Sequence, residues 1–442
     1  MGALVLNNVN VTHNFCFRET EVTTSATARG GGIYSGSGSS FTMTGGSISS
    51  NEGKGGGGGI YCASANVFEM NEVTVSNNYC ESKGAGIRVL TSDSNTADLT
   101  DCYIEANNLT VDSEAKGGGI YMEGGNLNMT RCDIVGNSSF KQGSGFYSKK
   151  GTTTATNCNI YWNGSNHYSN DDLGAGVYLY DKGSDHSIFI MDGGSIYENN
   201  SIGNGGGIYV EQGAVFQVKG NVIIKDNYRA SVGPGATNNN AYLTGSAVIE
   251  VVGPLGDDAI INITPHDGGG IAIEFAEGTS SGDPAEDLSH FALDCSDYSL
   301  IVDADGNIES YVPSEWNNTD TWNGTIAEAT NLDEGIPTSS SVITIHRAVK
   351  IPSGVTANAG TIYCDDFCDI IIEDGAQLIT NSSGVAVLAK KEIVAANEDA
   401  HTGWYLISAP VNTPAIAGET PATNLIATVS YRYDLYRYNE GG

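Results

Sequence analysis

The stretch Gly117-Gly118-Gly119-Ile120-Tyr121, followed by Asp133-Ile134-Val135-Gly136-Asn137, contains the pattern that decides the fold. The first part is a glycine-rich run that ends in an apolar residue and an aromatic one. The second is an apolar residue, two variable residues and an asparagine. The two elements alternate along the first half of the chain, and self-similarity at a period of roughly 20–50 residues is typical of solenoids.

The copies keep a common register. The apolar residue of the glycine-rich element recurs at Ile33, Ile60, Ile87, Ile120, Phe146, Val177 and Ile208. The asparagine of the second element recurs at Asn14, Asn51, Asn78, Asn107, Asn137, Asn163, Asn199 and Asn227.

The runs between these anchors alternate with a period of two, as in Phe41-Thr42-Met43 and Val73-Thr74-Val75, which indicates strands. Each unit is too short to bury its own apolar face, but stacked coils bury a continuous core and pair their backbones. The sequence therefore predicts an all-β fold, a right-handed parallel β-helix (solenoid), followed by a β-rich cap and a smaller second β-solenoid.

Four segments are expected. Residues 1–252 form the β-helix with seven or eight coils, and 253–312 a β-rich cap or connecting region. Residues 313–395 form the short second solenoid, and 396–442 the start of a truncated β domain. Because the chain begins in a strand-like run and stops abruptly, we expect a fragment of a longer exported protein whose signal peptide lies elsewhere.

The asparagines are expected to form a structural ladder. Glycine and asparagine accept left-handed backbone angles at the corners of a coil. Stacked asparagine side chains can also hydrogen-bond from coil to coil.

Cysteine usage does not indicate a disulfide framework, because the nine cysteines are an odd number scattered through a long chain. Cys102, Cys132 and Cys158 share an inward-facing position two residues before the apolar anchor. We expect them to be reduced, buried and free of metal, since closely spaced zinc-ligand pairs are missing. Cys364 and Cys368 form either a local disulfide or two free thiols.

An aromatic row follows the first anchor. If the anchor points inward, strand alternation places the next residue outside. This row comprises Tyr34, Tyr61, Arg88, Tyr121, Tyr147, Tyr178 and Tyr209. Two interpretations stay open: a self-packed ladder of rings, or an exposed strip that binds a ligand, with Arg88 as a charged anchor.

The formal net charge is −32, from 52 acidic and 20 basic residues. A polyanion is repelled by nucleic acid and by anionic lipid headgroups. Neutral glycans, proteins or divalent cations are more suitable partners. No stretch is long and apolar enough for a transmembrane segment, and a monomer is expected.

These repeats resemble those of chlamydial polymorphic outer-membrane proteins and related β-helix proteins, over roughly residues 1–312. The segment Gly403-Trp404-Tyr405-Leu406-Ile407-Ser408-Ala409-Pro410 resembles part of proteins exported by the type IX route of Bacteroidetes. The resemblance implies secretion or display at a bacterial cell surface and an adhesin-like role. Arg88 departs from the expected tyrosine, and the C-terminal β-barrel anchor of the chlamydial proteins is missing.

An enzyme is the alternative, because β-helices also carry polysaccharide lyases and hydrolases. Such an enzyme needs paired carboxylates with supporting histidine and basic residues. The chain offers Asp171-Asp172 without those supports, so we expect an ordinary loop there. Asp303-Ala304-Asp305-Gly306-Asn307 resembles the start of a calcium loop, but its glutamate falls one residue late, which favours a hairpin turn.

The sequence as a whole predicts an extracellular adhesin-like protein that binds glycan or protein through a stacked outer face and has no catalytic residues. No cofactor is expected, with weak calcium binding as the one exception. A polysaccharide-degrading enzyme and a purely structural surface spacer are the alternatives.

Overall fold

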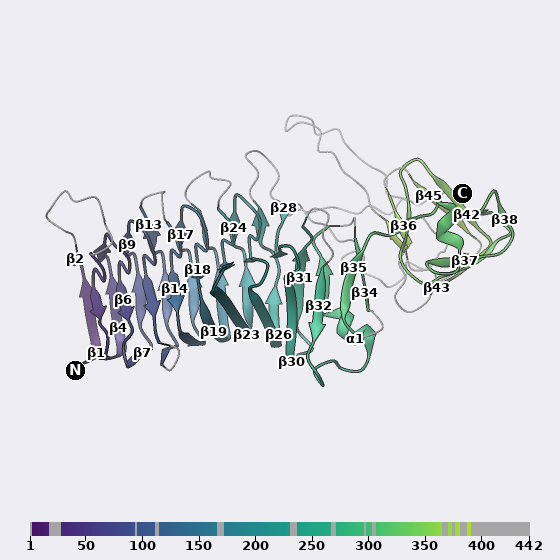
Figure 1. Cartoon of the computed structure of the whole chain (residues 1–442). Coiled ribbons are helices and arrows are strands. Elements are labelled where there is room, and N and C mark those ends of the chain that lie inside the picture. The colour runs from purple at the N-terminus through teal and green to yellow at the C-terminus, as the bar shows by residue number, and fades with distance from the viewer. Residues whose placement is uncertain are drawn as a thin grey trace, which may run out of the picture. The chain divides into compact units, whose positions relative to one another are not determined.

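The computed structural model describes residues 2–16, 28–92, 95–110, 115–165, 172–229, 237–266, 271–295, 298–302, 306–364, 370–373, 376–380 and 387–389. The chain divides into two compact units, Met1–Pro313 and Ser314–Gly442. In the first unit the described residues form a sheet of 26 strands and a second sheet of nine. Figure 1 shows these strands stacked in chain order from the N-terminus.

The glycine-rich element leads into the first ladder of strands. Its apolar anchors pair in register, so Ile60 lies beside Ile87 and Ile120 beside Phe146. The ladder consists of β3 (Ile33–Ser35), β6 (Ile60–Ala63), β10 (Ile87–Leu90), β14 (Ile120–Gly124), β18 (Phe146–Ser148), β21 (Val177–Leu179), β25 (Ile208–Val210) and β29 (Ala241–Leu243).

The alternating runs form the longest ladder, which ends just before the asparagines. Its strands pair in parallel with the strand of the next coil. They are β1 (Ala3–Thr12), β4 (Ser40–Ser49), β7 (Val67–Asn71), β8 (Thr74–Ser76), β11 (Thr96–Thr100), β12 (Tyr103–Glu105), β15 (Asn126–Thr130), β16 (Asp133–Val135), β19 (Gly151–Tyr161), β23 (Asp185–Tyr197), β26 (Val215–Ile224), β30 (Val248–Leu255) and β31 (Ile260–Thr264).

A third ladder of two-residue strands follows the asparagines and forms the nine-stranded sheet. Its members are β2 (Phe15–Cys16), β5 (Glu52–Gly53), β9 (Tyr79–Cys80), β13 (Asn108–Leu109), β17 (Ser138–Ser139), β20 (Gly164–Ser165), β24 (Asn200–Ser201), β27 (Tyr228–Arg229) and β28 (Thr237–Asn238). A short hairpin joins β22 (Asp181–Lys182) to the start of β23.

One continuous apolar core runs through the stack. Isoleucine anchors such as Ile60 and Ile120 are fully buried in it, together with Phe41, Phe68 and Met43. Neighbouring coils place like residues on like residues, as Phe41 does on Phe68 with ring centroids 5.3 Å apart. Because each coil buries its apolar side chains against the next, the repeats are stable only as a stack.

The parallel stacking extends further than the sequence indicated. The β-helix was expected to end near residue 252, with a cap after it. Instead β30 pairs in parallel with β32 (Ala272–Phe275), and β31 with β33 (Phe291–Leu293). Beyond these coils β34 (Ser299–Val302) and β35 (Ile308–Tyr311) pair antiparallel, and the short helix α1 (Pro284–Ser289) lies before β33. The next glycine-rich run, Gly268-Gly269-Gly270-Ile271, comes 63 residues after Ile208, about twice the spacing of the earlier copies, so the repeat pattern did not place these coils.

The corner residues also differ from expectation. The ladder asparagines do not carry the left-handed backbone; the residue before each of them does. Ala106, Gly136 and Trp162 have φ of 51°, 62° and 55°, directly before Asn107, Asn137 and Asn163. The asparagine is therefore selected for its side chain, and its predecessor absorbs the turn.

The second unit has its own core, with Trp316 and Trp322 in edge-to-face contact. One parallel sheet joins β36 (Ser314–Glu315), β41 (Val349–Ile351), β44 (Ile370–Ile372) and β46 (Val387–Ala389) in that order. Two further parallel pairs join β40 (Val342–Ile345) to β43 (Thr361–Cys364) and β42 (Thr356–Ala359) to β45 (Gln377–Thr380). Antiparallel pairs join β37 (Ala327–Ala329) to β40 and β38 (Leu332–Asp333) to β39 (Ile336–Pro337), and η2 (Thr319–Trp322) is a 3-10 turn. The smaller solenoid remains a prediction, and the expected segment 396–442 lies outside the described residues.

Candidate functional site

The predicted tyrosine strip is a buried stack. Tyr61, Tyr121, Tyr147 and Tyr178 are only 1–2% exposed, whereas Tyr34 is 57% exposed. The rings of Tyr121 and Tyr147 stack with centroids 5.1 Å apart and planes 4° apart, and Tyr147 stacks on Tyr178 at 5.2 Å and 6°. The expectation of an exposed strip is wrong for these four residues. The rings point away from the apolar core but bury one another, as the alternative of a self-packed ladder proposed.

A second layer of side chains closes over the stack. The backbones of Lys83, Lys116, Gln142 and Leu173 pair in parallel from coil to coil, four residues before the core anchors. The Lys116 ammonium lies 5.1 Å from the centre of the Tyr147 ring, and Gln142 donates to the Tyr178 hydroxyl. Burial raises the pKa of the Tyr147 and Tyr178 hydroxyls. These contacts make the row part of the fold.

Arg88 replaces one ring of the stack and is not a free charged anchor. Its guanidinium lies 4.9 Å from the Tyr61 ring centre and 5.7 Å from that of Tyr121. Two of its nitrogens donate to the Glu123 carboxylate at 2.7–3.0 Å, and Nη1 donates to the Gly55 carbonyl at 2.9 Å. The charge is thus paired and sandwiched within the protein.

The asparagines form a continuous hydrogen-bonded ladder. From Asn51 onward, each carboxamide accepts from the backbone and side-chain nitrogens of the preceding ladder asparagine, as Asn137 accepts from Asn107 at 3.0 Å twice. Each also donates to a backbone carbonyl, as Asn137 does to Ile104 at 2.8 Å. The ladder continues to Asn240 and ends on the Asp294 carboxylate. A Cβ on Gly119 would lie 2.9 Å from Asn137 Nδ2, which explains why glycine accompanies asparagine in each repeat.

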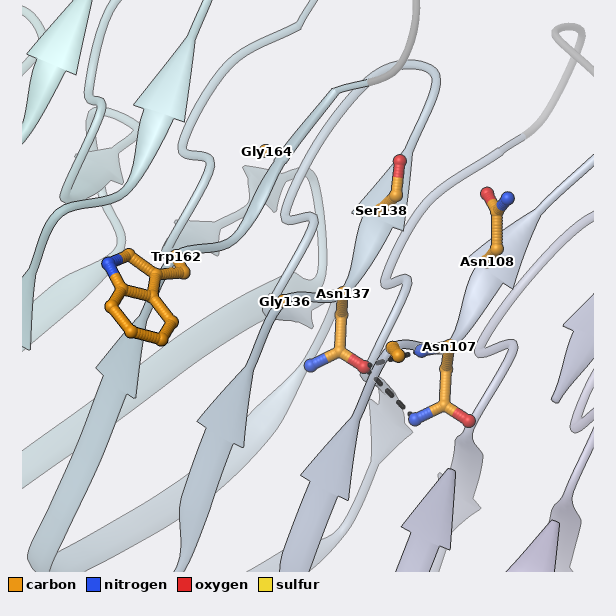
Figure 2. Close-up of a pocket in the computed structure, with 8 residues that line it drawn as sticks. Asn107, Asn108, Gly136, Asn137, Ser138, Trp162 and Gly164 are labelled. Carbon is orange, nitrogen blue, oxygen red and sulfur yellow. Dashed lines mark hydrogen bonds between the residues drawn. The ribbon is translucent and has the colours of Figure 1, made fainter. Parts of the chain in front are cut away.

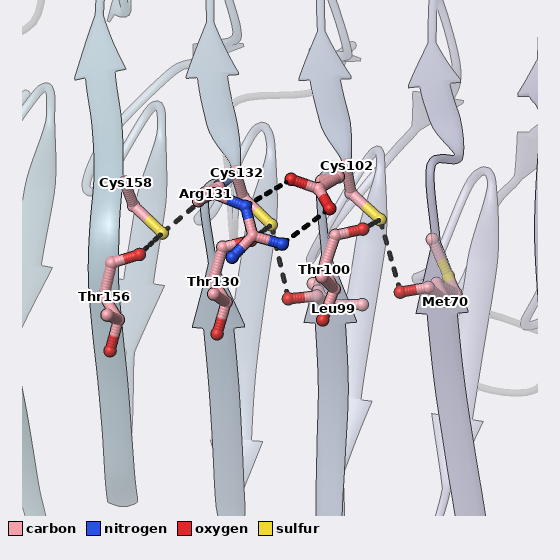
Figure 3. Close-up of polar contacts among 10 residues, drawn as sticks. Met70, Leu99, Thr100, Cys102, Thr130, Arg131, Cys132, Thr156 and Cys158 are labelled. Atoms are coloured by element: carbon pink, nitrogen blue, oxygen red, sulfur yellow. Dashed lines mark hydrogen bonds and ion pairs between the residues drawn. The ribbon is translucent and has the colours of Figure 1, made fainter.

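The three stacked cysteines lie side by side in the core as free thiols (Figure 3). Cys102 donates to the Thr100 carbonyl at 3.2 Å, Cys132 to Leu99 at 3.4 Å and Cys158 to Thr156 at 3.5 Å. Hydrogen bonding with Cys132, together with burial, raises the pKa of Cys102 and Cys158. All three side chains are fully buried and occupy a packing position in the core.

Asp172 differs from the ordinary loop residue that was expected. It is fully buried, and its Oδ2 accepts from the Ile202 backbone amide at 2.9 Å. Burial raises its pKa to about 8. Asp171 lies outside the described residues, as do residues 303–305, Cys368 and the Cys364 side chain. The strands that flank 303–305, β34 and β35, do pair as a hairpin.

An exposed hollow lies elsewhere, at the asparagine corner (Figure 2). Its volume is about 280 Å³, and eight residues line it, namely Ala106, Asn107, Asn108, Gly136, Asn137, Ser138, Trp162 and Gly164. The hollow exists because the left-handed corner residue is small in two successive coils, Ala106 and Gly136, and becomes Trp162 in the next. We call this feature the Trp162 hollow.

Its aromatic wall is built from adjacent coils. Trp162 is 63% exposed, and its indole meets the ring of Tyr161 edge-on with centroids 5.3 Å apart. Tyr161 in turn stacks on Tyr197 at 5.0 Å and 6°. The indole nitrogen donates to the Glu198 carboxylate. The wall is therefore held in one orientation before any ligand arrives.

The Trp162 hollow combines an indole face with amides and a hydroxyl, and none of its eight lining residues carries a titratable group. This composition suits recognition of a polar, uncharged ligand and offers nothing for acid–base chemistry. The repeat pattern does not predict this site, because Tyr161 and Trp162 occupy the two variable positions of the apolar-x-x-Asn element. Paired aromatics there, in Ile160-Tyr161-Trp162-Asn163, were the available signal.

Comparison with known families agrees with the geometry. Residues 4–160 match the model of the family described as right handed beta helix region. Together with the parallel ladders, this confirms the predicted all-β class and right-handed parallel β-helix. No curated protein and no solved structure matches the chain. Within the described residues, no helix has the length and apolar character needed to cross a membrane.

Proposed function

We propose that this chain is an extracellular, adhesin-like β-helix that binds its ligand without catalysis, and that the Trp162 hollow is the binding site. The observation that carries the proposal is a fixed, exposed indole beside a hollow whose lining residues lack titratable groups. Aromatic faces with neighbouring hydrogen-bonding groups are suited to ligands with both apolar and polar surfaces.

The rigidity of the stack supports a binding role. The wall residue Tyr161 ends β19, which pairs along its length with β15, β16 and β23, so little conformational entropy is lost on contact. A single hollow of about 280 Å³ gives modest affinity. Many copies displayed together would multiply that affinity through avidity, which fits an adhesin-like role at a bacterial surface.

Immobilised panels of glycans and proteins, probed with the purified chain, test the proposal. Trp162→Ala should abolish the strongest signals, because it removes the wall of the hollow. Tyr363→Ala is the matched control, since Tyr363 is an exposed aromatic (58%) in the second unit.

Binding that survives Trp162→Ala would refute the assignment of the site. Release of fragments from a polysaccharide panel would favour the enzyme alternative, and neither binding nor cleavage would favour a structural spacer.

A further inference from the structure

We infer that the ligand of the Trp162 hollow is an uncharged, linear oligosaccharide that lies along the stacking direction, between Trp162 and Tyr79. The inference rests on the proposed function and names the ligand class and its path. Four kinds of observation carry it: register, exposed rings, unpaired polar atoms and charge.

The register supplies a straight path. Tyr79, Asn108, Ser138 and Gly164 are direct neighbours in the parallel ladder of β9, β13, β17 and β20. Three coil spacings separate Tyr79 from Gly164, which is about 14 Å. Gly164 has no side chain to stand on the path beside Trp162, and a Cβ there would lie only 2.8 Å from the Asn200 carbonyl. A chain of repeating rings matches a path of repeating coils.

Exposed rings stand at both ends of this path. Trp162 is 63% exposed and Tyr79 is 41% exposed. The residues between them, Asn108 and Ser138, are small and polar. A ligand that spans the path therefore meets an aromatic ring at each end and hydrogen-bonding groups between them. This combination suits a sugar chain, whose rings have apolar faces and whose edges carry hydroxyl groups.

Two polar atoms on the path lack partners. Asn108 Oδ1 and Ser138 Oγ are buried and have no hydrogen-bond partner among the described residues, and Ser138 is only 8% exposed. Figure 2 shows both side chains directed away from the ladder asparagines Asn107 and Asn137. Both oxygens are covered in the free protein, so a ligand contacts them only after the Asn108 and Ser138 side chains rotate outward. A ligand that donates and accepts hydrogen bonds then satisfies atoms that the protein leaves unpaired at a cost. Sugar hydroxyls and acetamides do both.

Charge selects against acidic sugars. The chain carries a net charge of −32, and the Glu198 carboxylate accepts from the indole of the wall itself. Glu52 is the next residue of the ladder beyond Tyr79. The nearby Lys54 ammonium is paired with Glu81 at 3.1 Å. A uronate or sialylated chain would therefore be repelled, most strongly at low salt.

The experiment measures Kd by calorimetry for a length series of neutral oligosaccharides chosen from the strongest panel signals, and for a uronate series of equal length. Affinity should rise with length until the chain spans the path and then level off. Trp162→Ala and Tyr79→Ala should each weaken binding of the longer chains by about tenfold. For the shortest chain, Trp162→Ala should weaken binding and Tyr79→Ala should not.

Ser138→Ala provides a second arm, because it removes a hydroxyl that has no partner in the protein. It should leave the melting temperature unchanged and weaken binding severalfold, whereas Tyr363→Ala should leave both unchanged.

Uronate chains should bind about tenfold more weakly than neutral ones in low salt, with the gap closing as salt rises. Trp162-dependent binding that prefers uronates, or that ignores Tyr79, overturns this inference and leaves the proposed function standing. The absence of any Trp162-dependent binding overturns both.

Discussion

Replacing Asn137 by alanine tests whether the asparagine ladder holds the coils together. The Asn137 carboxamide makes four hydrogen bonds: it accepts from Asn107 N and Nδ2, each at 3.0 Å, and donates to the Ile104 carbonyl at 2.8 Å and to Asn163 Oδ1 at 3.1 Å. At about 1 kcal/mol net for each bond, the loss is about 4 kcal/mol. The side chain is only 1% exposed, so water cannot readily replace these partners.

Asn128→Ala is the matched control on the same coil. Asn128 is exposed, and its side chain donates to Asp98 at 3.0 Å. This substitution should change the free energy of unfolding by less than about 0.5 kcal/mol.

Urea titrations followed by circular dichroism would compare both variants with the wild type. Because a solenoid can unfold in sections, hydrogen exchange at coils 95–165 supplies a local reading. Equal midpoints for Asn137→Ala and Asn128→Ala, with unchanged exchange at Asn107 and its neighbours, would refute the reasoning that the ladder stabilises the stack.

Three further outcomes are expected. Arg88→Met should lower the free energy of unfolding by about 2–4 kcal/mol, because Glu123, whose side chain is 25% exposed, loses its partner. The double variant Arg88→Met with Glu123→Leu should recover much of this loss in thermal melts. No recovery would contradict this account of the ion pair. The Asp172 carboxyl has a pKa of about 8 in the folded protein against about 4 in the unfolded chain, so its contribution to the free energy of unfolding is fully present below pH 4 and is lost as the pH rises through 8, by up to about 1.4 kcal/mol per pH unit. The stability difference between wild type and Asp172→Asn should follow this slope. A pH-independent difference would show the carboxyl to be solvated. In native protein, iodoacetamide should label Cys16, which is partly exposed, and spare Cys102, Cys132 and Cys158 until denaturant is added; mass spectrometry of the peptides reads the result.

The repeat pattern predicted which side chains form the core, but not which side chains lie over the outward-pointing residues of the strands. Period-two alternation correctly places Ile120 inward and Tyr121 on the other side of the strand. The alternation carries no information on what lies over Tyr121. The ammonium groups of Lys83 and Lys116 lie over the Tyr121 and Tyr147 rings, and both lysines come from segments that precede the strands. Exposure of an outward ring is a tertiary property, so the strip and the buried stack could not be told apart from spacing alone.

The binding site was harder to predict for a related reason. A solenoid is specified by the residues that every coil shares, and the repeat pattern contains no information on the residues that vary. The Trp162 hollow arises from variation: Ala106, Gly136 and Trp162 occupy the same left-handed corner in successive coils and differ only in size. The shared asparagine fixes the position of each corner, and the residue before it is free to change without disturbing the ladder. On this account, the conserved geometry supplies rigidity and the variable corner supplies recognition, so replacing Gly136 by a large residue should close the hollow and leave the Asn107–Asn137 hydrogen bonds in place.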